Sequence, residues 1–169
     1  CEITIRLLNA LIDYQDYPIK AGETFTLNRR SLGVGITNLA GFLAKNKLSY
    51  YTPESLEIVD EWMEKIQYYL LDASCKMAEE SGACPKFGET KYAQGLCPYD
   101  WANSNAKKIV KRRPCMDWKG LKKRIREHGL KNSTVSAIMP CESSSVIQNS
   151  TNGIEPVRRL LTYKKAKNG

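Results

Sequence analysis

Asn132-Ser-Thr-Val-Ser-Ala-Ile-Met-Pro140 is the stretch of this chain that decides its fold. Residues 133–139 are small, β-branched or apolar, which is typical of a strand buried on both faces of a parallel sheet. Pro140 ends that strand, and the hydroxyl-rich cluster 141–145 is of the kind that caps helices, so a short helix is predicted over 146–148. A helix start after a strand presents free N–H groups. We therefore expect either an anion-binding turn or an ordinary helix cap at this point.

The composition fits one domain with a real core, since the chain has 169 residues, of which 42% are hydrophobic and 26% charged. No apolar run reaches membrane-spanning length and no signal peptide opens the sequence, so a cytoplasmic chain with no membrane association is expected. The six cysteines contain no C-x-x-C spacing and there is one histidine. These counts predict reduced thiols and no metal site.

Basic residues give the chain a formal net charge of +8, and many of them gather in one region. A nucleic-acid-binding surface would need aromatic or amide partners on the same face, and the cluster instead spans a linker around Pro114 and the wet side of a helix. We therefore interpret it as a solvated face, with a basic, non-catalytic nucleic-acid-binding module as the alternative. The cluster comprises Lys107, Lys108, Lys111, Arg112, Arg113, Lys119, Lys122, Lys123, Arg124 and Arg126.

Three helices are predicted from apolar spacing and from capping residues. The first covers 3–13 and buries Ile5, Leu8, Leu11 and Ile12. The longest begins at the Thr52 cap, has a proline in its first turn, and ends at Gly82. The third begins at the Asp117 cap and ends at Gly129. The core stripe of the longest helix comprises Leu56, Val59, Met63, Ile66, Leu70, Ala73 and Met77, and that of the third comprises Trp118, Leu121 and Ile125.

A second strand is predicted over 32–36, running into a helix that buries Leu39 and Leu43. Gly33 and Gly35 lack the third glycine of a dinucleotide-binding fingerprint, so we expect them to permit close backbone packing. Strands separated by long helical crossovers predict a parallel α/β fold.

Several motifs resemble one enzyme family. Asn-Ser-Thr-Val-Ser-Ala-Ile-Met-Pro-x-Glu-Ser-Ser-Ser, followed by Asn-Ser-Thr-Asn-Gly-Ile-Glu-Pro156, resembles the active-site strand and loop of the large subunit of class I ribonucleotide reductase, most of all the class Ia bacterial and phage form. The stretches 10–18, 28–44 and 82–95 are similar to that family as well, whereas the resemblance thins over 97–115.

The resemblance implies a partial segment of a ten-stranded α/β barrel. The chain would supply about two barrel strands with their helices, in strand–helix units of about 28–82 and 130–156. A variable basic loop would lie at about 97–116. No closed barrel can form from two strands alone. A truncated or decayed gene fragment without function is the remaining interpretation.

The family's substrate-phosphate loop corresponds to Pro140, Cys141, Glu142, Ser143 and Ser144, and the substrate is a ribonucleoside diphosphate. The resemblance implies no catalytic residue here, because no cysteine lies in the family's Asn-x-Cys-x-Glu pattern. The chain would be inactive alone and would bind no cofactor, since the family's radical cofactor is in the small subunit. Its implied partners are the rest of the large subunit and that small subunit.

Two positions depart from the family pattern. Cys141 stands where the family usually has serine, and a thiol is a poor hydrogen-bond donor. Val157-Arg-Arg replaces the usual Pro-Arg-Gly, which makes the loop from Arg158 to Gly169 more basic.

Overall fold

A computed structural model describes residues 1–157, 159 and 161. Most of the basic loop from Arg158 to Gly169 therefore lies outside the described residues. The α-helices in chain order are α1 (Glu2–Tyr14), α2 (Lys20–Arg29), α3 (Leu39–Lys45), α4 (Pro53–Ser81), α5 (Ser104–Ile109), α6 (Trp118–His128) and α7 (Glu142–Ile147), with short 3-10 helices η1 (Phe87–Glu89) and η2 (Pro98–Trp101) between α4 and α5.

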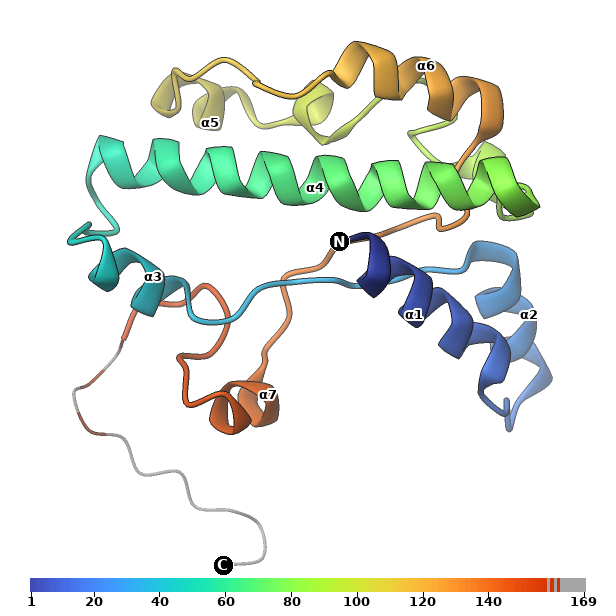
Figure 1. The fold of residues 1–169 in the computed structure, drawn as a ribbon, viewed down its shortest axis with the longest axis horizontal. Helices are drawn as coiled ribbons and strands as arrows, with labels where there is room; N and C mark the ends of the chain where they lie inside the picture. Colours follow the sequence, from blue (N-terminus) through green and yellow to red (C-terminus); the bar gives the residue numbers. More distant parts are fainter. Residues whose placement is uncertain (158, 160, 162–169) are drawn as a thin grey trace, which may run out of the picture.

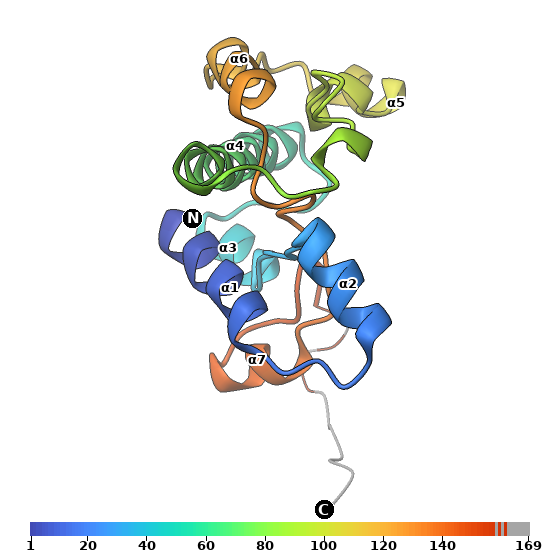
Figure 2. The ribbon, with the colours of Figure 1, turned by 90° about the vertical axis from the view of Figure 1, so that its right-hand side faces the viewer.

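Helix α4 runs through the middle of the molecule and separates two groups of helices (Figures 1 and 2). Helix α6 packs on one side of it and α1 on the other. The core between them consists of fully buried side chains, each of which stabilises the fold by about 2 kcal/mol. These side chains are Ile5, Leu70, Leu71, Leu121, Ile125, Leu130 and Val135.

The predicted boundaries of α4 are confirmed. The Thr52 hydroxyl accepts a hydrogen bond from the Ser55 N–H, Pro53 is the first helical residue, and Gly82 follows the helix with φ 81°. The stripe is buried only in its C-terminal half, which contains Leu70, while Leu56 remains 36% exposed. The other two helices are also present, and Leu121 and Ile125 are buried as predicted. Leu11 of α1, which was predicted to be buried, is 46% exposed.

The two predicted strands do not form. Among the described residues there is no strand, and the pairing of residues 32–36 with 133–139 amounts to one isolated parallel bridge, between Val34 and Ser136, and one further backbone hydrogen bond. The Val34 N–H donates to Val135 O at 3.1 Å and the Ala137 N–H donates to Val34 O at 3.1 Å. The next bond slips in register, because the Leu32 N–H donates to Thr134 O. Two extended segments that pair only with each other in the described structure do not form a regular ladder of hydrogen bonds. The prediction of two strands was therefore wrong, although the two segments do run parallel, as predicted.

Gly33 and Gly35 allow this close approach, as predicted. A Cβ on Gly35 would lie 2.5 Å from Ala137 O and 2.6 Å from Met139 Sδ, and a Cβ on Gly33 would lie 3.2 Å from Ala137 Cβ. The two segments can therefore run side by side only because these positions carry no side chain.

A buried polar network fixes the amino-terminal end of the 132–140 segment. The Asn132 N–H donates to Ser74 Oγ at 2.9 Å, and Ser74 Oγ donates to Asn132 Oδ1 at 3.0 Å. Asn132 Nδ2 donates to Asn9 Oδ1 and to Arg30 O, at 3.1 and 2.9 Å. The Arg30 guanidinium donates to Asn9 and to Asp13, and its hydrogen bonds to Asp13 lower the pKa of that carboxyl. The network ties α1, α4 and the segment after α2 to Asn132.

Glu64 joins α4 to the start of α6. Although burial raises its pKa, hydrogen bonds from Trp118 Nε1, from the Arg112 guanidinium and from the N–H groups of Met116 and Cys115 bring the pKa down to about 2. The Glu64 side chain, which is 8% exposed, thus holds the chain around 112–118 against α4.

Candidate functional site

The segment after Met139 forms a sharp turn into α7, and all five residues of the predicted phosphate loop lie in this turn. Cys141 precedes the helix with φ −113° and makes no side-chain cap. The first bond of the helix runs from the Ser145 N–H to Cys141 O at 2.8 Å. Within the described part of the chain, the N–H groups of Glu142, Ser143 and Ser144 have no acceptor, as is usual for the first turn of an uncapped helix. The turn therefore presents three free donors.

The side chains of this turn differ in exposure. Pro140, Glu142, Ser143 and Ser144 are exposed, whereas Ser145 is 1% exposed and donates to Glu142 O at 3.0 Å. Buried Ser145 anchors the helix, and the other serines remain available to a ligand.

The prediction that the hydroxyl cluster caps a helix over 146–148 was wrong. The helix begins at Glu142, so the cap position falls on Cys141, whose thiol donates instead to Met139 O at 3.4 Å. The Cys141 N–H donates to Asn152 Oδ1 at 2.5 Å, and the extended backbone ends at this residue. Because α7 begins at Glu142, Ser143 lies inside the first helical turn. Hydroxyls inside a helix cannot cap it.

A cavity of about 610 Å³ opens beside α7. It lies between the helix and the returning loop 149–157, and its lining includes Glu142, Ser145, Asn152 and Arg159. Arg159 adds a cation to a surface that otherwise carries the acids Glu142 and Glu155. The described lining thus carries two carboxylates and one guanidinium, and it does not include Ser143 or Ser144.

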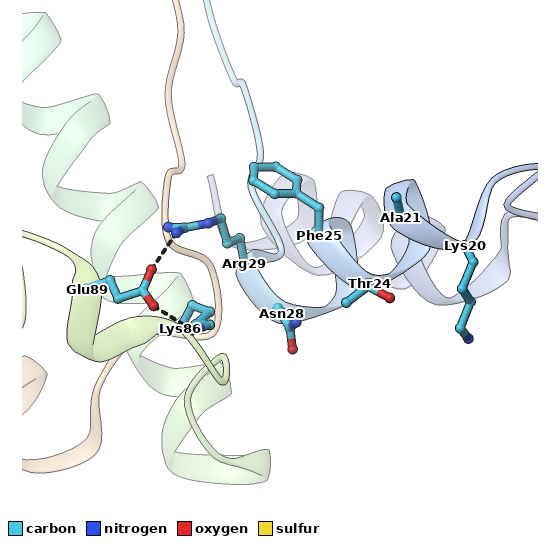
Figure 3. A pocket seen from close by; sticks show the side chains of 8 residues that line it. All are labelled: Lys20, Ala21, Thr24, Phe25, Asn28, Arg29, Lys86 and Glu89. Carbon is cyan, nitrogen blue, oxygen red and sulfur yellow. Dashed lines mark hydrogen bonds and ion pairs between the residues drawn. The ribbon is translucent and has the colours of Figure 1, made fainter.

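A second hollow, of about 470 Å³, lies between α2 and η1 (Figure 3). Figure 3 shows Glu89 between Arg29 and Lys86, and the carboxylate oxygens lie 2.5 and 2.6 Å from their nitrogens. Hydrogen bonds from Lys86 and Arg29 lower the pKa of Glu89, so it stays charged. Because these two cations already share an anion, this hollow is a weaker candidate for an anionic ligand than the turn before α7.

Several members of the basic cluster are paired within the chain. Arg112 contacts Asp60 and Glu64, and Lys122 contacts Asp100 at 2.6 Å. Arg124 contacts two acids of α4, Asp72 and Glu79. Arg112 and Arg124 therefore link α4 to the segment before α6 and to α6, and Lys122 links α6 to η2.

Asn152 and Asn38, which hold the loop beside the turn, were not singled out from the sequence. Asn152 precedes Gly153, a pairing typical of turns, and Asn38 precedes a helix. These local signals mark turns but do not reveal which distant N–H group the amide oxygen accepts.

Two further observations concern the described residues. No helix there combines the length and hydropathy needed to cross a bilayer. No group of three or more potential metal-ligating side chains gathers there either.

Taken together, the described residues form a mainly helical fold with one isolated parallel bridge and an exposed start of α7. Comparison with known proteins gives the family. The profile described as "Ribonucleotide reductase, barrel domain" matches residues 1–169, and the chain belongs to this family.

Similar curated proteins are alpha subunits of ribonucleoside-diphosphate reductase. The Haemophilus influenzae protein is 46% identical over 165 residues, which cover 98% of this chain and 22% of the relative. The ribonucleoside-diphosphate reductase 1 subunit alpha of Escherichia coli K12 is 46% identical over 158 residues, covering 94% of this chain and 21% of the relative. The alpha subunit of Enterobacteria phage T4 is 41% identical over 168 residues, which cover 99% of this chain and 22% of the relative. The chain thus spans about a fifth of the length of these relatives.

Proposed function

We propose that this chain contributes the substrate-phosphate loop of a ribonucleoside-diphosphate reductase large subunit, which reduces ribonucleoside diphosphates to deoxyribonucleoside diphosphates. The family membership and the names of the relatives support the activity. The proposal includes the finer assignment of residues 28–82 and 130–156 as two strand–helix units of an α/β barrel, with 97–116 as a variable loop. The parallel bridge between Val34 and Ser136 supports the pairing of these units.

One observation carries the proposal: the N–H groups of Glu142, Ser143 and Ser144 have no acceptor within the described structure. An unpaired donor gains a charge-assisted hydrogen bond when a phosphate oxygen approaches it, and such bonds are about twice as strong as neutral ones. The Ser143 and Ser144 hydroxyls are exposed and add donors, while Pro140 and Cys141 shape the turn. Glu142 opposes an anion, so its carboxylate would turn aside.

The loop binds and orients the substrate but does no chemistry itself. The radical cysteine pattern is absent from the sequence, so the chain alone is expected to be inactive. The rest of the large subunit would supply the reacting groups, and a small subunit would carry the radical cofactor. Consistent with such a machine, the proposed location is the cytoplasm.

A basic nucleic-acid-binding module is the second candidate. The net charge of +8 favours it, whereas the ion pairs of Arg112, Lys122 and Arg124 oppose it. Sequence-independent binding of DNA that survives moderate salt would support this candidate, because such salt removes the weak attraction that any basic chain has for phosphates.

The experiment that tests the proposal is calorimetric titration with cytidine diphosphate of the wild-type chain and of Ser144→Asp and Ser144→Ala. A carboxylate among the free donors would occupy and repel the phosphate site, so Ser144→Asp should weaken binding by about 3 kcal/mol. Ser144→Ala should lose only about 1 kcal/mol, the usual contribution of one hydrogen bond.

Ser104→Asp is the matched control, because Ser104 is an exposed serine in the first turn of another short helix, α5. This variant should bind as tightly as the wild-type chain. Equal affinities for the wild-type chain and Ser144→Asp would reduce the serine cluster to an ordinary helix start and remove the proposed function.

A further inference from the structure

A third hollow, of about 580 Å³, adjoins the one between α2 and η1 and lies at the end of the two extended segments that is opposite to α7. Its lining includes Ser31 from the start of one segment and Ser133 and Thr134 from the start of the other. The Ser31 and Ser133 hydroxyls are hydrogen-bonded at 2.9 Å, whereas the exposed Thr134 hydroxyl has no partner among the described residues. This hollow shares no described lining residue with the cavity beside α7, so it is a separate candidate site.

Two exposed aromatic rings line the same hollow. Phe25 of α2 is 60% exposed, and Trp101 at the end of η2 is 39% exposed. Tyr92, which packs against the hydrophobic core, contacts the Trp101 ring in an edge-to-face arrangement with centroids 5.9 Å apart. The Asp100 carboxylate caps η2 and pairs with Lys122, which fixes this short helix. The rings are therefore held in place without a ligand, and nucleobases stack on exposed rings of this kind.

One cation of this hollow has no acidic partner. Lys91 Nζ lies 4.9 Å from the centroid of the Trp101 ring and forms no ion pair with any described residue. Arg29, the other cation of the lining, lies over the Phe25 ring and is already paired with Glu89 (Figure 3). Two cations against this one carboxylate leave the described lining positively charged. An anionic group that enters the hollow can therefore accept a charge-assisted hydrogen bond from Lys91.

A nucleotide matches this combination of groups, and about 580 Å³ is a usual size for a small-molecule pocket. We propose that this hollow binds a nucleoside phosphate. The base stacks against Phe25 and Trp101, and the phosphate accepts from Lys91. The free Thr134 hydroxyl then faces the sugar. The inference goes beyond the proposed function and does not rest on it, because it uses no residue of the turn before α7.

The test follows the indole N–H resonances of the three tryptophans while adenosine 5′-monophosphate is added to the full 169-residue chain. The Trp101 resonance, which Trp101→Phe assigns by deleting it, should shift and saturate. Trp118 Nε1 donates to Glu64, and Trp62 lines a hollow between α3 and α4, so their resonances should stay in place. Adenosine alone and inorganic phosphate alone should each bind about tenfold more weakly than the nucleotide, because each makes only part of the contacts.

Two substitutions separate the cation from the ring, and both residues are exposed, so neither change removes buried contacts. Lys91→Ala should weaken nucleotide binding about tenfold, the loss of one hydrogen bond to a charged group, and Lys91→Arg should keep the affinity within about threefold. Phe25→Ala should weaken binding about tenfold because a stacked base is lost, and Phe25→Tyr should bind as tightly as the wild-type chain. Lys45→Ala and Tyr51→Ala are the matched controls, since they remove an exposed cation and an exposed ring that do not line the hollow.

A Trp101 resonance that does not move at millimolar nucleotide would overturn the inference. So would an affinity that Lys91→Ala and Phe25→Ala leave unchanged. Inorganic phosphate that binds as tightly as the nucleotide would overturn it as well, since the rings would then contribute nothing. The Trp101 readout is local, so none of these results bears on the proposed function of the turn before α7.

A single-stranded nucleic acid carries the same base and phosphate, and a neighbouring pair could hold a second nucleotide. Lys107 Nζ lies 5.0 Å from the centroid of the Tyr99 ring, which belongs to η2 like Trp101. A second titration therefore uses an oligodeoxyadenylate. An affinity per site within about tenfold of that of the free nucleotide supports the inference, whereas a higher affinity would overturn the assignment to a free nucleotide and give the hollow to a strand.

Discussion

Asn132 and Cys141 mark the two ends of one extended segment, and the two ends use their polar groups in opposite ways. Asn132 is fully buried, and its N–H, Oδ1 and Nδ2 are all hydrogen-bonded to side chains or backbone of other elements. The turn after Cys141 is exposed and leaves three N–H groups without an acceptor in the described structure. The end at Asn132 therefore stabilises the fold, whereas the end at Cys141 has free N–H groups that can donate hydrogen bonds to a ligand.

The largest loss of stability should come from removing the buried side chain of Asn132. Asn132→Ala would leave the Ser74 hydroxyl without its acceptor and Arg30 O without its side-chain donor, and it would remove one of the two hydrogen bonds that Asn9 Oδ1 accepts. Because each buried unsatisfied group costs about 1–3 kcal/mol, the free energy of unfolding should fall by about 3–5 kcal/mol. Urea denaturation would measure this loss, with Asn105→Ala as the exposed control. A loss below about 1 kcal/mol would show that the network does not carry stability.

An intermediate effect is expected at Glu64, whose hydrogen bonds are exposed or only partly buried, unlike those of Asn132, and depend on charge. Glu64→Gln should lower the free energy of unfolding at pH 7 by about 2 kcal/mol, since hydrogen bonds to a charged group are lost. The folded-state pKa of Glu64 is about 2, below its ordinary value of 4.5, so its contribution is present above pH 4.5 and disappears as the pH falls toward 2.

Urea denaturation as a function of pH checks this sign. The wild-type chain should lose more stability between pH 5 and pH 2 than Glu64→Gln does, and the two should converge at the acid end. Parallel curves would mean that the carboxylate of Glu64 is not stabilised in the folded chain.

The smallest effect is expected at Cys141, where the exposed end departs from the family's serine. The thiol bonds only Met139 O, and a serine hydroxyl could instead accept from the first turn of α7. Cys141→Ser should therefore leave diphosphate affinity unchanged or raise it slightly, by less than about threefold, and change stability by less than about 1 kcal/mol. Calorimetric titration and urea denaturation would measure both, and a large loss of affinity would assign the thiol a direct role.

The sequence predicted those elements whose signals are local. Thr52, Pro53 and Gly82 define the ends of α4 by caps that act within a few residues, so their positions could be predicted. Helix α2 was missed because Lys20–Arg29 has no buried residue and contains a glycine and two threonines, which leaves no apolar stripe. The exposure of Leu11 depends on which elements face α1, which spacing within the helix cannot reveal.

The candidate site was predictable only in part, for the same reason. The position of the turn follows from Pro140 and the polar cluster after it, which are local features. The place of Cys141 directly before α7 depends on its contact with Asn152, which is distant in sequence. The absence of a regular strand likewise depends on how residues 133–139 meet residues 32–36. Pairing of this kind depends on the packed backbone and cannot be found from residue type alone.

Binding of a phosphate by the free N–H groups is tested most directly by the response of backbone amide resonances when pyrophosphate is added to the wild-type chain. We expect saturable chemical-shift changes that are largest at the amides of Glu142, Ser143 and Ser144 and absent around Asn132, whose donors are already bonded. Largest changes in the basic region around Lys108, Lys111 and Arg113, or none at the start of α7 at saturating pyrophosphate, would contradict it.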